Sequence, residues 1–342
     1  MKGIAFLFIF FILKTSSSQQ SFNFAAVDHY VSTVPAAMPD SLAKNLTKPY
    51  QTEPEKVRAI FKWVTTNINY NTNKYRNRNF SQNLWKEDED TARELKPLSE
   101  RVAIMVLQRK TAVCDGYARL FKTLCDYAGI ESEIIRGYAR SSWGRSGQFI
   151  SNHIWNTVRI NGSWHLFDAT WASGYVTFFS NEFISSYDDS YFMASPTVFI
   201  KDHYPEDENW TLLPKTTAVK EFQTSPFKYA AIHQFKISSY QPTKGIIEAS
   251  VGDTIYFSVQ GNETEKLFRI SNNPYVDSSL FNYDDSRYYP KPAGLINTKL
   301  AQQNFVVENN YAEWLYVILN EEIIMRYRLV IKNSSHALAE GF

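Results

Sequence analysis

The dipeptide Asn161-Gly162 separates two strand-like segments, residues 151–160 and 163–171. Asn-Gly is the dipeptide most typical of a two-residue type I′ turn, which joins adjacent antiparallel strands. With this turn Ile160 faces Ser163, so the numbers of opposed residues sum to 323 along the whole hairpin. The sequence therefore predicts both the pairing of these strands and its register.

The predicted register places four side chains on one face of the hairpin, because opposed residues share a face. They are His153, Trp155, Asp168 and Thr170. His153 and Asp168 form a diagonal pair whose backbones are about 7–8 Å apart, which side chains can span. A carboxylate at that distance holds an imidazole in one tautomer and stabilises its cation. His165 falls on the opposite face and is not expected to join them.

The chain has two cysteines, Cys114 and Cys125, and both lie in a segment with helical spacing of apolar residues that ends at Gly129. Eleven residues of helix separate their backbones by about 16 Å. A disulfide requires less than about 7 Å, so the two cannot pair. Cys125 belongs to the apolar stripe and is predicted to be a buried, inert thiol. Cys114 begins the helix, where unpaired N–H groups and the dipole favour a thiolate.

Cys114, His153 and Asp168 together have the residue types of a cysteine acyl-transfer site. The imidazole takes the proton of the thiol, and the carboxylate orients the imidazole. The N–H of Cys114 is a candidate donor to the developing oxyanion. The alternative is that His153 is a hydrogen-bonded core histidine and Asp168 a cap beside the turn; their shared face favours catalysis.

The sequence predicts no metal site and no cofactor. Four further histidines have no Cys, His or carboxylate at metal-ligand spacing; they are His29, His203, His233 and His336. The acidic run at 87–90 lacks the glycine and terminal glutamate spacing of a calcium loop and is interpreted as a solvated surface.

The remaining patterns predict an α+β protein of two domains. Helices are expected within residues 28–47, from Pro54 to about Ile68, and over 99–108, and a strand over 131–139. Residues 71–97 and 187–213 are interpreted as loops. From residue 215 the chain is predicted to be all-β, with strands at 246–251, 254–260, 315–319 and 323–331 that form a sandwich-like domain. The predicted organisation is a signal at 1–20, a catalytic domain at 21–214 and a β-rich accessory domain at 215–342.

The first twenty residues have the pattern of an export signal. Lys2 precedes an apolar run at 4–13 and a small, polar stretch at 15–20. Ten apolar residues are fewer than the roughly 20 that cross a bilayer. We therefore expect a cleaved signal, an exported protein and no stable membrane insertion; the alternatives are an uncleaved anchor or a buried first strand. Six Asn-x-Ser/Thr sites are glycan acceptors in a eukaryotic secretory route, at Asn45, Asn79, Asn161, Asn209, Asn262 and Asn333.

The balance of charge argues against a nucleic-acid partner. The chain has 36 basic and 35 acidic residues, so it has no basic field to hold phosphates. The β-rich domain is expected to dock the enzyme to a partner or surface.

Three blocks resemble the transglutaminase-like superfamily of Cys-His-Asp proteins. They are TAVCDGYA around Cys114, NHIWN around His153 and WHLFDATW around Asp168. Cys114 and His153 are 39 positions apart, and His153 and Asp168 are 15 positions apart. The segment AIFKWV at 59–64 and residues 199–213 are similar to the kyphoscoliosis-peptidase-like branch. The resemblance spans residues 28–213. The Tyr70-Asn71 position departs from this branch, where Tyr-Asp is expected.

The resemblance implies a papain-like core with the cysteine on a helix packed against an antiparallel sheet. It implies that Cys114 is the nucleophile, His153 the general base and acid, and Asp168 the orienting carboxylate. The implied reaction is attack on an amide carbonyl of a protein or peptide substrate to form a thioester, which water or an amine then resolves. The calcium-binding features of animal transglutaminases are not visible. Several relatives have lost triad members, so a non-catalytic binding or structural module is the alternative function.

Overall fold

A computed structural model describes residues 23–72, 96–140, 149–177, 180–216, 218–233, 235–261, 267–273 and 300–332. The predicted signal at 1–20, the acidic run at 87–90 and His336 lie outside the described residues. Most of the predicted loop at 71–97 also lies outside them.

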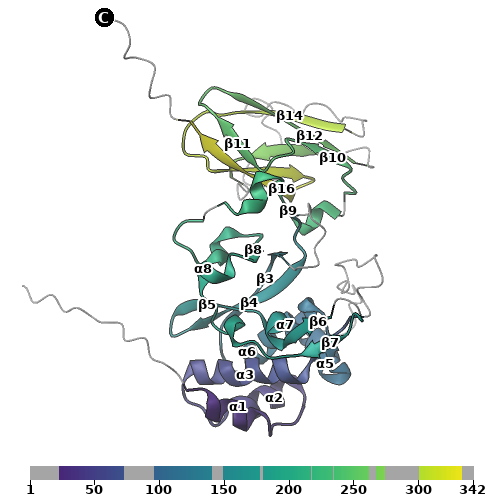
Figure 1. Cartoon of the computed structure of the whole chain (residues 1–342), viewed down its shortest axis with the longest axis vertical. Coiled ribbons are helices and arrows are strands. Elements are labelled where there is room, and N and C mark those ends of the chain that lie inside the picture. Colours follow the sequence, from purple (N-terminus) through teal and green to yellow (C-terminus); the bar gives the residue numbers. More distant parts are fainter. Residues whose placement is uncertain are drawn as a thin grey trace, which may run out of the picture.

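Residues 25–127 supply a layer of helices, which lies below the four-stranded sheet of strands β3, β4, β5 and β8 in Figure 1. The helices are α1 (Ala25–Val31), α2 (Pro39–Thr47), α3 (Glu53–Asn67), α5 (Leu98–Arg109) and α6 (Cys114–Tyr127). Helix α3 has Pro54 in its first turn, where a missing N–H costs nothing. Past the end of α6 Gly129 adopts a φ of 70°, which ends the helix as predicted. The ring of Phe61 in α3 packs against Phe121 in α6 at a centroid distance of 5.6 Å.

A four-stranded antiparallel sheet lies against these helices in the order β5-β4-β3-β8. Its strands are β3 (Ser132–Ala139), β4 (His153–Ile160), β5 (Ser163–Phe167) and β8 (His203–Pro205). Asn161 and Gly162 have positive φ values of 50° and 81°, as a type I′ turn requires. The pairs from Ile160↔Ser163 to Asn156↔Phe167 confirm the predicted register.

The second strand of the hairpin is shorter than predicted. It ends at Phe167, and residues from Ala169 form a short helix, α7 (Ala169–Ser173). The carboxylate of Asp168 accepts the N–H groups of Thr170 and Trp171, and this cap turns the chain out of the sheet. The register of β4 and β5 therefore ends at the pair Asn156↔Phe167, before the strand pairs that the sequence predicted for Asp168 and Thr170.

Residues 187–213 are not the plain loop that the sequence suggested. They contain the 3₁₀ helices η1 (Asp189–Tyr191) and η2 (Glu208–Thr211), the short helix α8 (Pro196–Phe199) and strand β8. Two short strand pairs lie outside the four-stranded sheet. The strands β1 (Asn69–Tyr70) and β2 (Thr111–Ala112) are parallel, and β6 (Gly174–Val176) and β7 (Phe183–Ser185) are antiparallel.

The C-terminal part is strand-rich, as predicted, and its two sheets face each other. One sheet has the order β10-β12-β14, and the other has the order β11-β16-β15-β13 with β9 beside β16. The rings of Phe257 and Tyr327 meet between the sheets at a centroid distance of 5.4 Å within a buried apolar core. The strands are β9 (Phe227–Lys228), β10 (Ser239–Gln241), β11 (Ile246–Ala249), β12 (Thr254–Gln260), β13 (Phe268–Ser271), β14 (Leu300–Val306), β15 (Trp314–Leu319) and β16 (Glu322–Ile331).

A buried aromatic cluster joins the four-stranded sheet to the C-terminal sheets. Its members are Phe149, Tyr204, Phe222, Phe227 and Tyr229. The predicted boundary between residues 214 and 215 falls between η2 and η3 (Lys220–Gln223), and the division into two domains stays a prediction. Within the described residues, no helix is long and apolar enough to span a bilayer.

Candidate active site

Cys114 is the first residue of α6 and is partly buried. A residue at this position has an N–H with no carbonyl in a preceding turn, and it lies at the positive end of the helix dipole. The buried side chain of Asn156 in β4 fixes α6 against the sheet. Its Nδ2 donates to the carbonyls of Ala118 in α6, at 3.1 Å, and Glu133 in β3, at 3.2 Å. The helix that bears Cys114 is thus tied to the strand that begins at His153.

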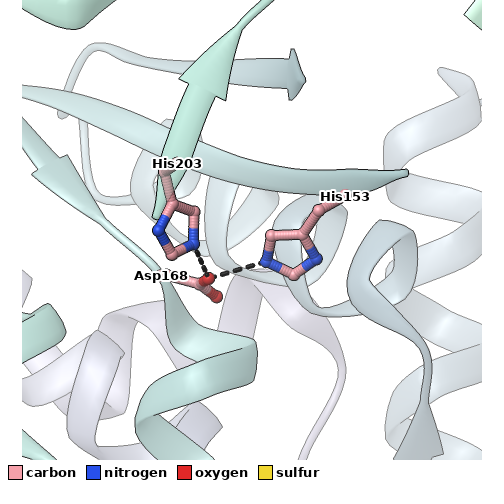
Figure 2. Close-up of side chains that lie close together, drawn as sticks. All are labelled: His153, Asp168 and His203. Atoms are coloured by element: carbon pink, nitrogen blue, oxygen red, sulfur yellow. Dashed lines mark hydrogen bonds and ion pairs between the residues drawn. The ribbon is translucent and has the colours of Figure 1, made fainter. Parts of the chain in front are cut away.

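His153 is buried at the first position of β4, and its Nε2 donates to Asp168 Oδ2 over 2.7 Å (Figure 2). Burial by itself lowers the pKa of His153, but the charge of Asp168, the hydrogen bond to it and the hydrogen bond with Cys114 raise it to about 10. Since Nε2 is engaged by Asp168, Nδ1 is the nitrogen available to the thiol. His153 therefore lies between the other two predicted residues.

Asp168 is completely buried and uses both of its oxygens. Oδ1 accepts the N–H groups of Thr170 and Trp171 at 2.9 and 3.0 Å, and Oδ2 accepts from His153. Burial acts to raise the pKa of Asp168, but the charges and hydrogen bonds of His153 and His203 hold it well below its usual range. Asp168 therefore caps α7 and is also the hydrogen-bond partner of His153.

His203 belongs to the same cluster, although its spacing along the sequence did not place it beside Asp168. Its Nε2 lies 2.9 Å from Asp168 Oδ2, and its Nδ1 lies 2.6 Å from Asp202 Oδ1 (Figure 2). Each ring nitrogen of His203 therefore faces a carboxylate oxygen. The ring stacks on Phe199 with centroids 4.0 Å apart and meets Trp171 edge-on at 4.4 Å.

The sequence signal for His203 was its place in residues 199–213, which resemble the kyphoscoliosis-peptidase-like branch. Spacing along the chain did not reveal it, because β8 pairs with β3, more than sixty residues earlier.

The donor atoms of His153, Asp168 and His203 lie within 4.8 Å of one another, a grouping that metal ions also use. A zinc ligand must be an unprotonated nitrogen about 2.0–2.1 Å from the metal. Here each Nε2 is at hydrogen-bonding distance from the same carboxylate oxygen. The distances among these three side chains are those of hydrogen bonds from two imidazoles to one carboxylate oxygen.

The other sequence-predicted residues lie where expected. His165 is in β5 opposite Val158, and burial lowers its pKa. Cys125 is fully buried in the apolar core, and burial raises the pKa of its thiol, which keeps it protonated and unreactive.

The site combines a cysteine at the start of a helix with a histidine on an antiparallel sheet, and a buried carboxylate orients the imidazole. Thiol acyl-transfer proteins use this arrangement. Residues 40–169 match the family model described as the transglutaminase-like superfamily, and this part of the chain belongs to that superfamily.

Curated relatives support the same family. The chain is 30% identical over 233 residues to kyphoscoliosis peptidase of Homo sapiens, covering 67% of this chain and 32% of that protein. It is 29% identical over 216 residues to kyphoscoliosis peptidase of Mus musculus, covering 62% and 30%. It is 24% identical over 256 residues to Lim and transglutaminase domain protein ltd-1 of Caenorhabditis elegans, covering 71% and 31%. The chain thus spans about a third of the length of these relatives.

Proposed function

We propose that the protein is an exported, thiol-dependent acyl-transfer enzyme that acts on amide bonds of proteins or peptides. The observation that supports this most is the position of His153, hydrogen-bonded to Asp168 through Nε2 and in contact with Cys114. The names of relatives, peptidase and transglutaminase domain protein, support the same class of reaction. Export rests on the apolar run at 4–13.

The proposed reaction begins with the thiolate of Cys114 and the protonated ring of His153. The sulfur attacks the amide carbonyl carbon, and the N–H of Cys114 donates to the oxyanion that forms. The C–N bond then breaks, and His153 gives its proton to the departing amine. The product of this half is a thioester on Cys114 and a free amine.

The second half resolves the thioester. Water or a primary amine attacks the carbonyl carbon, and His153 takes the proton of the attacking group. The C–S bond breaks and the thiolate of Cys114 returns. With water the product is a carboxylic acid, and with an amine it is a new amide. The same three residues serve both outcomes, so the acceptor decides between a peptidase and a transamidase.

Mass spectrometry of the products from dye-labelled casein, with and without an added primary amine, tests this proposal. We expect cleaved or deamidated peptides without the amine, amine-linked peptides if transamidation occurs, and loss of both with Cys114→Ala. Cys125→Ala is the matched control, because Cys125 is buried away from the site, and it should retain the products.

Equal product from wild type and Cys114→Ala would contradict the proposal. Absence of product from wild type, together with a Cys114 thiol as slow as an ordinary cysteine, would instead favour a non-catalytic binding module.

A further inference from the structure

Arg326 of β16 is a buried cation that reaches out of the C-terminal sheet toward the candidate active site. Its side chain is 1% exposed. Nη2 donates to the carbonyl of Pro205 at 2.9 Å, and Nη1 donates to the carbonyl of Glu206 and to Tyr229 Oη. Nε pairs with Glu208 Oε1 at 3.2 Å. Most of these acceptors belong to the segment that directly follows His203.

Pro205, which accepts from Arg326, is aligned with His153 across the four-stranded sheet. Gly137 in β3 is opposite Pro205 on one side and opposite His153 on the other. His203 is two residues before Pro205, at the other end of the same short strand. A shift of β8 would therefore change the position of His203 relative to Asp168.

A second connection reaches the strand of His153. Lys228 of β9, which pairs with Met325 of β16, donates its N–H to the carbonyl of Phe149 at 3.0 Å. The N–H of Ser151 donates to the carbonyl of Lys228 at 2.9 Å. These bonds end two residues before His153. The segments that hold the two imidazoles are thus both bonded to the C-terminal sheet.

The charge of Arg326 is kept in spite of its burial. Burial acts to lower its pKa, but Tyr229, Tyr204 and Glu208 raise it above the usual value. The guanidinium also lies 4.8 Å from the ring centroid of Tyr204 and 4.6 Å from that of Phe227. A buried charge is seldom the most stable way to fill such a space, and its best-attested use is to specify one arrangement. Here the planar fork specifies where the carbonyls of 205 and 206 lie.

We propose that Arg326 is a positioning residue of the active site, acting through residues 203–205 to hold His203 against Asp168. The C-terminal sheet is then part of the catalytic unit as well as any docking surface it provides. This inference rests on the proposed function, in that it assigns a role within the same site. It requires Arg326 itself to touch neither substrate nor the reacting atoms.

The test compares Arg326→Met with Arg328→Met in the full chain. Arg328 lies two positions further along β16 and pairs with Glu313. Both arginines stack on Trp314. The charge of Arg328 also acts on Glu208, but its side-chain hydrogen bond goes to Glu313 and not to residues 205–208. One readout is the rate of alkylation of Cys114 by iodoacetamide across the pH range. The other is the NMR signal of the ring N–H groups of His203, which needs no substrate.

With Arg326→Met we expect the His203 signal to be lost or shifted and alkylation at neutral pH to fall by about tenfold, the worth of one hydrogen bond to a charged group. Arg328→Met should stay within about twofold of wild type. Leu329→Ala is a control for loss of stability, because it removes core contacts from the same strand. Leu329 belongs to the apolar core between the C-terminal sheets and not to the contacts with residues 205–208, so this variant should leave both readouts unchanged.

If Arg326→Met fails to fold, Arg326→Lys decides, because it keeps the charge but cannot present two parallel donors. A His203 signal and alkylation rate equal to wild type in the variant that folds would overturn the inference. Failure of the proposed function looks different: wild type itself would show slow, ordinary alkylation of Cys114, while the His203 signal would still respond to Arg326→Met.

Discussion

Asp168→Asn is expected to lower the turnover of any amide substrate by about 10⁴-fold, the loss seen when an orienting carboxylate becomes an amide. Asn keeps the oxygen that accepts the N–H groups of Thr170 and Trp171, so the cap of α7 survives. It replaces Oδ2 by an NH₂ donor that faces the donating Nε2 of His153. The ring then turns its N–H toward Cys114 and can no longer take the proton of the thiol.

The pH dependence of stability gives the same substitution a second readout. The folded pKa of His153, about 10, lies above its unfolded value of about 6.5. Its contribution to the free energy of unfolding is therefore complete below about pH 6.5 and is lost as pH rises through about 10. Asp168, whose pKa is depressed, contributes above about pH 4 and less as the solution becomes more acidic. We expect the decline above neutral pH to be much weaker in Asp168→Asn.

Urea unfolding at a series of pH values measures this effect, with product formation measured in parallel. Asp188→Asn is the matched control, because the Oδ1 of Asp188 likewise caps a short helix by accepting the N–H of Ser190. Wild-type turnover in Asp168→Asn, or identical pH curves for the two proteins, would show that the carboxylate does not orient His153.

Gly137→Ala is expected to destabilise the protein by about 3 kcal/mol or more, at the upper end for an overpacked core. A Cβ at this position would overlap the backbone oxygen of Tyr204 and the indole of Trp155, and would lie 2.8 Å from the Cα of Pro205. The backbone atoms belong to β8 and the indole lies beside His153, so the chain has little room to relax without moving β8 from β3.

Denaturant unfolding compares this variant with Gly129→Ala. A Cβ at Gly129 meets nothing within 4 Å, so only the positive φ of 70° opposes it, at about 1 kcal/mol. A loss with Gly137→Ala no larger than with Gly129→Ala would mean that β8 is not packed against β3 as described.

The hairpin shows what local sequence can predict about this fold. The Asn161-Gly162 turn needs only two residues with positive φ, so the register followed directly from it. The contact of His153 with Asp168 was also predicted, but on the assumption that the strand continues to residue 171. The structure makes the contact instead from the first turn after the strand, since Asp168 caps α7. The apolar pattern did not show that residues after Phe167 would form a capped helix and not a continued strand.

His203 and Arg326 mark the limit of the same reasoning. Strand β8 has three residues, too few for a periodic pattern, and its partner β3 is remote in sequence. Arg326 lies in a strand whose apolar residues predict a place in the core of a β-sandwich. An arginine within such a strand does not by itself predict a particular contact. Both residues depend on how distant segments pack, which neither spacing nor periodicity records.

The alkylation of Cys114 by iodoacetamide as a function of pH, in wild type and in His153→Gln, is the most direct measurement of the central claim. We expect rapid alkylation of Cys114 in the wild type already at about pH 6, where ordinary thiols with a pKa of about 8.5 react slowly. In His153→Gln the rate at that pH should fall to that of an ordinary thiol. A wild-type rate that rises only above about pH 8, with no change in the variant, would contradict the pairing of thiol and imidazole on which the proposed chemistry depends.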